Sequence, residues 1–190
     1  MNHPLSGHDQ GETLFQNGLK ALEADRFADA TEAFQRALAL FTNRGDALEE
    51  RLRTLTNLGH SLAACQEHES ALAAFKEALE VAESMGDTTQ KAWQNANIGS
   101  VYRDMNRHDL SRPHYETALT LFAGEKDRGG LAAQYANLGY LDAMQGNLAS
   151  AIEQFEKART IFSLLGRLEQ SSLAEQNLVM LRKKSMESHE

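Results

Sequence analysis

Apolar and small residues recur along the chain at intervals of three and four, a spacing that places them on one face of a helix. One such set is Ala30, Phe34 and Ala37. Related sets follow at steps of about 40 residues, namely Ala71, Phe75 and Ala78; Ser111, Tyr115 and Ala118; and Ala151, Phe155 and Ala158. Small residues beside an aromatic ring let a neighbouring helix approach closely. The pattern therefore predicts four related helices, each packed against a partner helix.

A second set of positions repeats with the same period and marks these partner helices. Asparagine recurs every 40 residues within a triplet of asparagine, an apolar residue and a third, mostly small residue. The triplets are Asn57-Leu58-Gly59, Asn97-Ile98-Gly99, Asn137-Leu138-Gly139 and Asn177-Leu178-Val179. Self-similarity at such a period is typical of stacked repeats, in which each unit buries its apolar face only against its neighbours. We therefore predict an all-α, right-handed solenoid of antiparallel helix pairs.

Glycine and aspartate separate the predicted pairs. Gly45-Asp46 and Gly86-Asp87 place glycine where one helix ends and aspartate where the next begins, and Lys126-Asp127 keeps the aspartate. Glycine tolerates the left-handed conformation of a helix C-terminus, and aspartate accepts hydrogen bonds from free amides. We predict helix pairs at about 11–44, 46–85, 87–125 and 127–166, and a capping helix at about 168–185. Residues 1–10 are expected to be a flexible or disordered lead, and residues 186–190 a tail.

The amino-acid composition indicates which cellular compartment and which classes of partner to expect. Hydrophobic content of 42% is sufficient for a folded body. Cys65 is the only cysteine, so an intramolecular disulfide is impossible and a reducing cytoplasm is expected. The polar N-terminus does not resemble a secretory signal, and no apolar run is long enough to span a membrane. A net charge of −8 disfavours nucleic acid as a partner.

Signals for catalysis are weak. The 7 histidines show no spacing typical of zinc ligands. The segment from Gly124 to Gly130 is rich in glycine but lacks the Lys-Ser/Thr pair of a phosphate-binding loop. Cys65 lies near the end of a predicted helix and is better explained by packing than by nucleophilic chemistry. We therefore expect a protein that is not an enzyme and needs no metal or cofactor.

The residues of one repeat resemble a known family. Leu58-Gly59 in the first helix is followed by Ala71, Phe75 and Ala78 in the second, a pattern that resembles the tetratricopeptide repeat. The standard repeat has about 34 residues. The longer period here is similar to the extended subclass of kinesin light chains and Pins-type scaffolds. The resemblance covers about residues 11–185 and implies a non-enzymatic scaffold whose concave groove binds an extended segment of a partner protein.

The resemblance also suggests where a partner binds. In the extended subclass, asparagines at this position contact cargo peptides, and each amide offers one donor and one acceptor group to a peptide backbone. The alternatives are that the asparagines bridge adjacent helices, or that repeat duplication merely copied them. The predicted peptide-binding residues are Asn57, Asn97, Asn137, Asn177, Arg53, His60, Trp93, Ser100, Arg103, Tyr140, Met144, Met180 and Lys183. The carboxylate clamp that binds chaperone tails is not expected, because its positions hold Phe15, Leu19, Thr56 and His60.

Charge along the groove suggests the chemistry of the ligand. Arg53, Arg103, Lys183 and Lys184 outnumber the nearby acids, so we expect an acidic segment with an aromatic or large aliphatic anchor. Trp93 either lines the groove or packs between repeats. An alternative function is self-association, either through the exposed solenoid ends or by insertion of a terminal segment into its own or a neighbour's groove.

Overall fold

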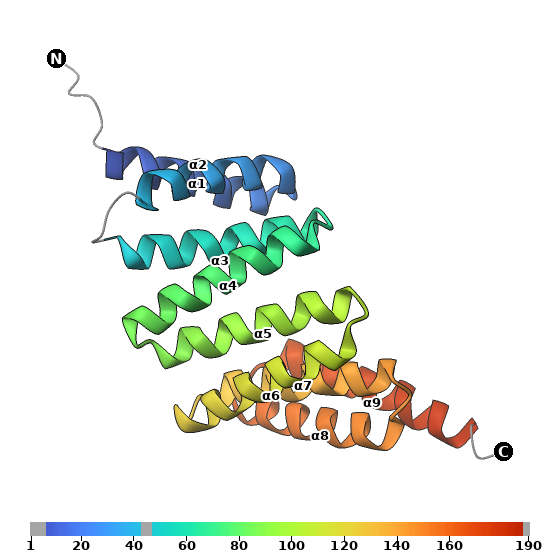
Figure 1. Cartoon of the computed structure of the whole chain (residues 1–190). Coiled ribbons are helices and arrows are strands. Elements are labelled where there is room, and N and C mark those ends of the chain that lie inside the picture. Colours follow the sequence, from blue (N-terminus) through green and yellow to red (C-terminus); the bar gives the residue numbers. More distant parts are fainter. Residues whose placement is uncertain (1–6, 43–46, 188–190) are drawn as a thin grey trace. The chain divides into compact units, whose positions relative to one another are not determined.

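The computed structural model describes residues 7–42 and 47–187, and within these ranges all regular secondary structure is helical (Figure 1). The helices are α1 (Gly7–Glu23), α2 (Phe27–Thr42), α3 (Leu48–Ala64), α4 (His68–Met85), α5 (Thr88–Asp104), α6 (His108–Gly124), α7 (Arg128–Met144), α8 (Leu148–Leu164) and α9 (Leu168–Glu187). The chain divides into two compact units, Met1–Gln90 and Lys91–Glu190, and the division falls within α5. Each unit is described by itself below.

The first unit contains the pairs α1–α2 and α3–α4. In each pair an aromatic ring from the second helix lies against a glycine of the first. A Cβ atom on Gly18 would lie 2.5 Å from the ring of Phe34, and one on Gly59 would lie 2.5 Å from the ring of Phe75. Both rings are almost completely buried. Glycine is therefore required for the close approach that the repeating pattern predicted.

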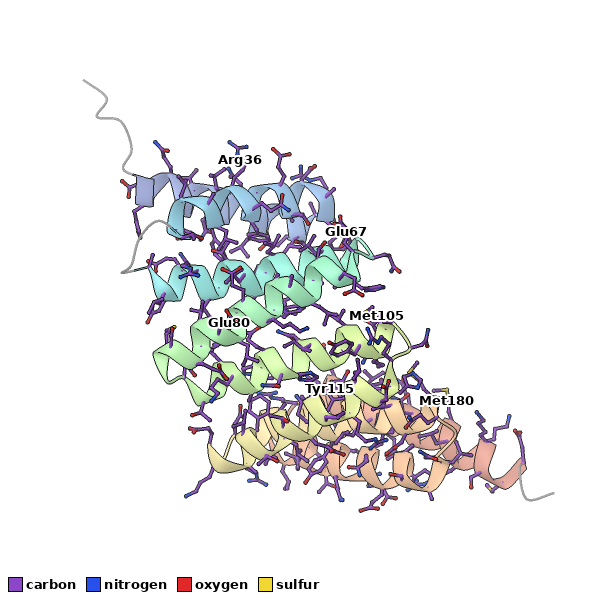
Figure 2. All side chains as sticks on the ribbon, viewed as in Figure 1. Arg36, Glu67, Glu80, Met105, Tyr115 and Met180 are labelled. Atoms are coloured by element: carbon purple, nitrogen blue, oxygen red, sulfur yellow. The ribbon has the colours of Figure 1, made fainter. Side chains whose placement is uncertain are left out.

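The second unit repeats this arrangement in α5–α6 and α7–α8. Tyr115, labelled in Figure 2, is fully buried against Gly99, and Phe155 lies against Gly139. Burial raises the pKa of the Tyr115 phenol, so the group stays neutral at physiological pH. Its hydroxyl donates a hydrogen bond to Oγ of Ser100 at 3.1 Å. The aromatic position of each repeat thus joins the two helices of its own pair.

The helix ends confirm part of the predicted pattern of glycine and aspartate between helix pairs. Gly86 ends α4 in the left-handed conformation, with φ of 68°. Asp87 accepts a hydrogen bond from the backbone amide of Gln90 at 2.9 Å, and Asp127 accepts one from that of Gly130 at 2.9 Å. The remaining pair, Gly45-Asp46, lies outside the described residues. Aspartate therefore begins α5 and α7 by satisfying a free amide, as the sequence predicted.

Two local features differ from the sequence-based expectation. Helix α1 begins at Gly7, inside the segment expected to be flexible, because His8 contacts Glu50 of α3 at 3.2 Å and packs edge-on against Phe41. Residues 1–6 lie outside the described range. Proline is usually found in the first turn of a helix, but α6 begins at His108 and continues through the exposed Pro113. No helix in the described ranges is both long and apolar enough to cross a membrane.

Candidate functional site

A hollow of about 190 Å³ lies between α7 and α9 in the second unit, and we call it the α7–α9 hollow. Small side chains on the two helices leave the space, and buried aromatic rings of α8 line it as well. Its lining residues are Ala133, Ala136, Asn137, Tyr140, Phe155, Phe162, Gln170, Leu173, Ala174 and Asn177. Three of the predicted binding residues, Asn137, Tyr140 and Asn177, are therefore brought together around one largely apolar hollow.

A hydrogen bond crosses this hollow and orients two of these side chains. Nδ2 of Asn177 donates to the hydroxyl of Tyr140 at 2.9 Å and to the carbonyl oxygen of Leu173 at 2.9 Å. The Tyr140 ring packs edge-on against Phe155, with centroids 4.9 Å apart. Asn177 thus links two helices, which is one of the structural roles considered for the asparagines.

The asparagines of α5 and α7 are held differently, by two glutamines that are not among the predicted binding residues. Nδ2 of Asn97 donates to Oε1 of Gln94 at 3.3 Å, and Nδ2 of Asn137 donates to Oε1 of Gln134 at 3.1 Å. Both glutamines are fully buried. Each precedes its asparagine by three residues, and the recurrence of this pair after 40 residues was a signal available in the sequence. Among the described residues, Oδ1 of Asn97 and of Asn137 accepts no hydrogen bond.

The first unit has a separate, more polar hollow of about 420 Å³ beside α3. It is lined by Glu49, Leu52, Arg53, Thr56, Asn57, Met85, Asp87 and Gln90. Nδ2 of Asn57 donates to the carbonyl oxygen of Arg53 at 2.7 Å, within the same helix. Arg53 forms an ion pair with Glu12, and its guanidinium lies 4.3 Å from the centre of the Phe15 ring. Arg53 and Asn57 therefore share this hollow, and both already have partners within the unit.

The residue that follows the triplet glycine has a consistent packing role. His60 packs edge-on against Phe75 at 5.1 Å between centroids, and Ser100 accepts the hydrogen bond of the buried Tyr115. Tyr140 packs against Phe155 in the same way. Three predicted binding residues are thus also contacts between the paired helices, and the sequence pattern did not show this.

Three further predicted residues lie apart from both hollows. Trp93 packs edge-on against Phe122 with centroids 4.8 Å apart and is 36% exposed, so it combines packing with a solvent-facing edge. Met144 is exposed at the end of α7. Met180, labelled in Figure 2, is also exposed and belongs to α9.

The predicted cations lie beside acids. Arg103 contacts Asp104 at 2.9 Å, and Lys183 lies 3.9 Å from Glu187. With Arg53 paired to Glu12, these contacts partly neutralise the positive charge expected along the groove. Among the described residues, no three His, Cys, Asp or Glu side chains gather as metal ligands would.

Paired helices with small-to-aromatic contacts define a helical-repeat protein. A family model described as "Tetratricopeptide repeat" matches residues 90–163, and a second model of the same description matches residues 51–85. The chain belongs to the tetratricopeptide repeat family. No curated protein matches the sequence.

Solved structures share the fold at low sequence identity. Aspartyl phosphate phosphatase F from Bacillus subtilis aligns with a TM-score of 0.87 and 14% identity, covering 97% of this chain and 48% of that one. The Rap conjugation gene regulator of plasmid pLS20, solved with the Phr* peptide, aligns with a TM-score of 0.69 and 16% identity, covering 90% of this chain and 53% of that one. A putative kinesin light chain repeat protein from Podosopora anserina aligns with a TM-score of 0.76 and 11% identity, covering 97% of this chain and 90% of that one. These likenesses confirm the all-α solenoid fold, and the chain spans about half the length of the first two.

Proposed function

We propose that this chain is a non-enzymatic interaction module that binds an extended peptide segment of another protein along α5, α7 and α9. The observation that carries the proposal is the pair of asparagine oxygens, Oδ1 of Asn97 and Asn137, at equivalent positions of successive repeats. Gln94 and Gln134 hold the amide groups from the other side, so each oxygen is available as an acceptor. An extended peptide presents its backbone N–H groups at regular intervals, which suits a row of acceptors.

The α7–α9 hollow would receive the anchor residue of the ligand. Its floor includes the buried rings of Phe155 and Phe162, and its rim carries the half-buried Tyr140 and the exposed Leu173. An aromatic or large aliphatic side chain placed there would bury apolar surface, which is worth about 25 cal/mol per Å². Because Arg53 and Arg103 are already paired with acids, we propose that the anchor supplies more affinity than acidic residues of the ligand do.

Comparisons of fold support binding more directly than catalysis. One structural neighbour was solved with a peptide, whereas another is named as a phosphatase that is about twice as long as this chain. The hollow described here is lined by amide, aromatic and aliphatic groups and contains no paired acid and base. We propose that the chain binds its partner without chemical conversion. The cytoplasmic location expected from the lone Cys65 also remains a prediction.

The test uses a random peptide library displayed on phage and selected on the full chain. The best peptide is then synthesised with a fluorophore and titrated by anisotropy against the Asn97→Ala/Asn137→Ala variant. Loss of two hydrogen bonds of about 0.5–1.5 kcal/mol each predicts an affinity that is weaker by roughly fivefold to 150-fold. Circular dichroism checks that the variant stays helical.

Asn17→Ala is the matched control, because Asn17 is an exposed asparagine of α1 outside the repeating triplets. This variant should bind the peptide as the parent chain does. Trp93 emission should also change on binding, since one edge of the ring is exposed. Unchanged affinity in the double variant would show that the asparagines are structural, and failure to select any peptide would contradict the binding proposal itself.

A further inference from the structure

The sequence of α9 matches that of the first helix in each pair. Helix α8 packs against α9, but the described residues contain no second helix that would complete a pair with α9. Asn177, Leu178 and Val179 occupy the positions of the earlier triplets. In those triplets the third residue is a glycine covered by an aromatic ring, whereas Val179 is 59% exposed. The face of α9 that corresponds to a covered face in α3, α5 and α7 is therefore open.

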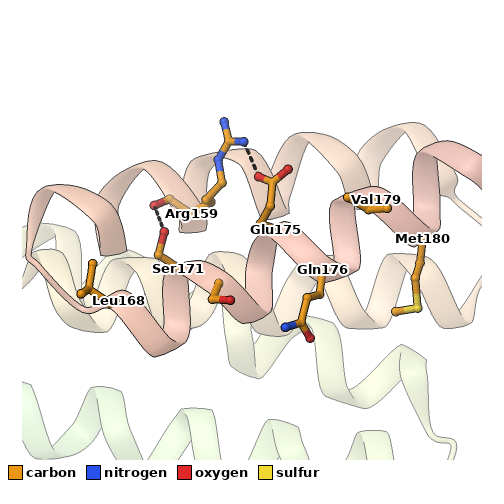
Figure 3. Close-up of a pocket in the computed structure, with 8 residues that line it drawn as sticks. Arg159, Leu168, Ser171, Glu175, Gln176, Val179 and Met180 are labelled. Carbon is orange, nitrogen blue, oxygen red and sulfur yellow. Dashed lines mark hydrogen bonds and ion pairs between the residues drawn. The ribbon is translucent and has the colours of Figure 1, made fainter.

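This open face is apolar and borders a hollow beside α8 (Figure 3). Leu168, Leu173, Val179, Met180 and Met186 are each between 52% and 76% exposed. The opposite side of the helix holds the buried Ala174, Leu178 and Leu181. Exposure of so many large apolar side chains on one helix is typical of an interaction surface.

A second helix of the usual repeat type does not fit this face. A Cβ atom on Gly59, Gly99 or Gly139 would lie 2.5 to 2.9 Å from the aromatic ring that covers that glycine. Val179 carries a Cβ atom and two methyl groups at the same position. An aromatic residue in the usual register would therefore clash, and the occupant must pack differently.

The charged residues along the open face are arranged so that one copy of the face is complementary to a second copy of it. Glu169 and Lys183 lie seven residues before and after Gln176, on the exposed side of α9. Glu169 has no ion-pair partner among the described residues, and Lys183 has only the exposed Glu187 at 3.9 Å. The two charged residues that line the hollow, Arg159 and Glu175, pair with each other between α8 and α9, and Arg182 of α9 pairs with Glu156 of α8.

We propose that two copies of this chain associate through α9, packed antiparallel about a two-fold axis at Gln176. Glu169 of one copy then lies opposite Lys183 of its partner, and the contact occurs twice because the axis repeats it. Leu173 lies opposite Val179, and Met180 lies opposite Ser172. Antiparallel packing also sets the two helix dipoles in opposite directions, which is favourable. This proposal does not depend on peptide binding by α5 and α7.

The test is sedimentation equilibrium of the full chain with reversed charges. Glu169→Lys and Lys183→Glu each place like charges opposite one another twice, so each single variant should associate at least roughly tenfold more weakly. The double variant Glu169→Lys/Lys183→Glu restores opposite charges and should associate as the parent chain does. Lys20→Glu makes the same change of charge on an exposed residue of α1 and should have no effect.

A cross-linking experiment tests the register independently. Gln176 faces its own copy across the axis, so Gln176→Cys in a Cys65→Ser background should form a disulfide-linked dimer under mild oxidation. Gln145→Cys, at another exposed position, should form no disulfide-linked dimer. A parent chain that stays monomeric across the micromolar range would overturn the proposal. So would a dimer that is unaffected by either single charge reversal, because another surface would then be responsible.

Separate experiments can contradict the proposed association through α9 and the proposed peptide binding. Glu169→Lys should leave the affinity for the selected peptide unchanged, because Glu169 is not a predicted peptide-binding residue and does not line the α7–α9 hollow. Loss of peptide binding in Asn97→Ala/Asn137→Ala should likewise leave the association of the chain unchanged.

Discussion

The glycine of each triplet shows how one residue sets the distance between two helices. The ring of Phe75 occupies the space that a side chain on Gly59 would need, and Tyr115 does the same at Gly99. Glycine lowers helix propensity by about 1 kcal/mol relative to alanine. At these positions the burial of an aromatic ring outweighs that cost.

The first prediction concerns this contact. Gly59→Ala places a Cβ atom 2.5 Å from the ring of Phe75, so the free energy of unfolding should fall by about 1–3 kcal/mol. Gly124→Ala is the control, because a Cβ atom there meets nothing within 4 Å and α6 gains helix propensity. Urea unfolding followed by circular dichroism measures both. Equal effects in the two variants would show that the close contact does not control stability.

At the scale of elements, a buried carboxylate joins three helices of the second unit. Asp142 of α7 is 2% exposed and accepts hydrogen bonds from Arg112 of α6 and, at 2.6 Å, from Ser150 of α8. Arg112 also donates to Gln145 at 3.1 Å. Because the carboxylate is buried and fully partnered, it fixes the relative positions of α6, α7 and α8.

The second prediction removes this carboxylate. Asp142→Ala should lower the free energy of unfolding by about 2–4 kcal/mol, because Arg112 and Ser150 lose a shared acceptor. Glu116→Ala is the matched control, since Glu116 lies 4.0 Å from the same arginine but is exposed. Exposed pairs contribute about 0–1 kcal/mol. Denaturant unfolding compares the two variants, and a loss as large for Glu116 as for Asp142 would contradict the role assigned to burial.

At the scale of the whole molecule, each of the two compact units has a hydrophobic core of its own. Leu52, Leu55 and Val81 pack together in the first unit, and Phe155, Leu178 and Leu181 pack together in the second. In repeat proteins stability is approximately a sum over repeats and their nearest-neighbour interfaces. A substitution in one unit should therefore affect the unfolding of that unit most.

The third prediction uses Trp93 to separate the units. Trp93 is the only tryptophan and packs against Phe122 in the second unit, so its fluorescence reports that unit, whereas circular dichroism reports all helices. Gly59→Ala should shift the urea midpoint measured by circular dichroism more than the midpoint measured by fluorescence. Asp142→Ala should shift the fluorescence midpoint strongly. Identical shifts by both methods in both variants would mean that the chain unfolds as one cooperative body.

The sequence by itself determined the class of fold. Intervals of three and four define helix faces, and their return after 40 residues defines the repeat, because both signals depend only on spacing along the chain. The caps at Asp87 and Asp127 were predicted for the same reason, since capping involves neighbours in sequence.

The tertiary structure decided which groups of the candidate site are already engaged. Asn137 is held by the buried Gln134, Asn177 reaches Tyr140 of another helix, and Arg53 is paired with Glu12 of α1. It also decided that Val179 is exposed where the equivalent glycines are covered. The contact of Asn177 with Tyr140, the pair of Arg53 with Glu12 and the exposure of Val179 all depend on side chains that are distant in sequence. Such side chains meet, or fail to meet, only when the helices pack.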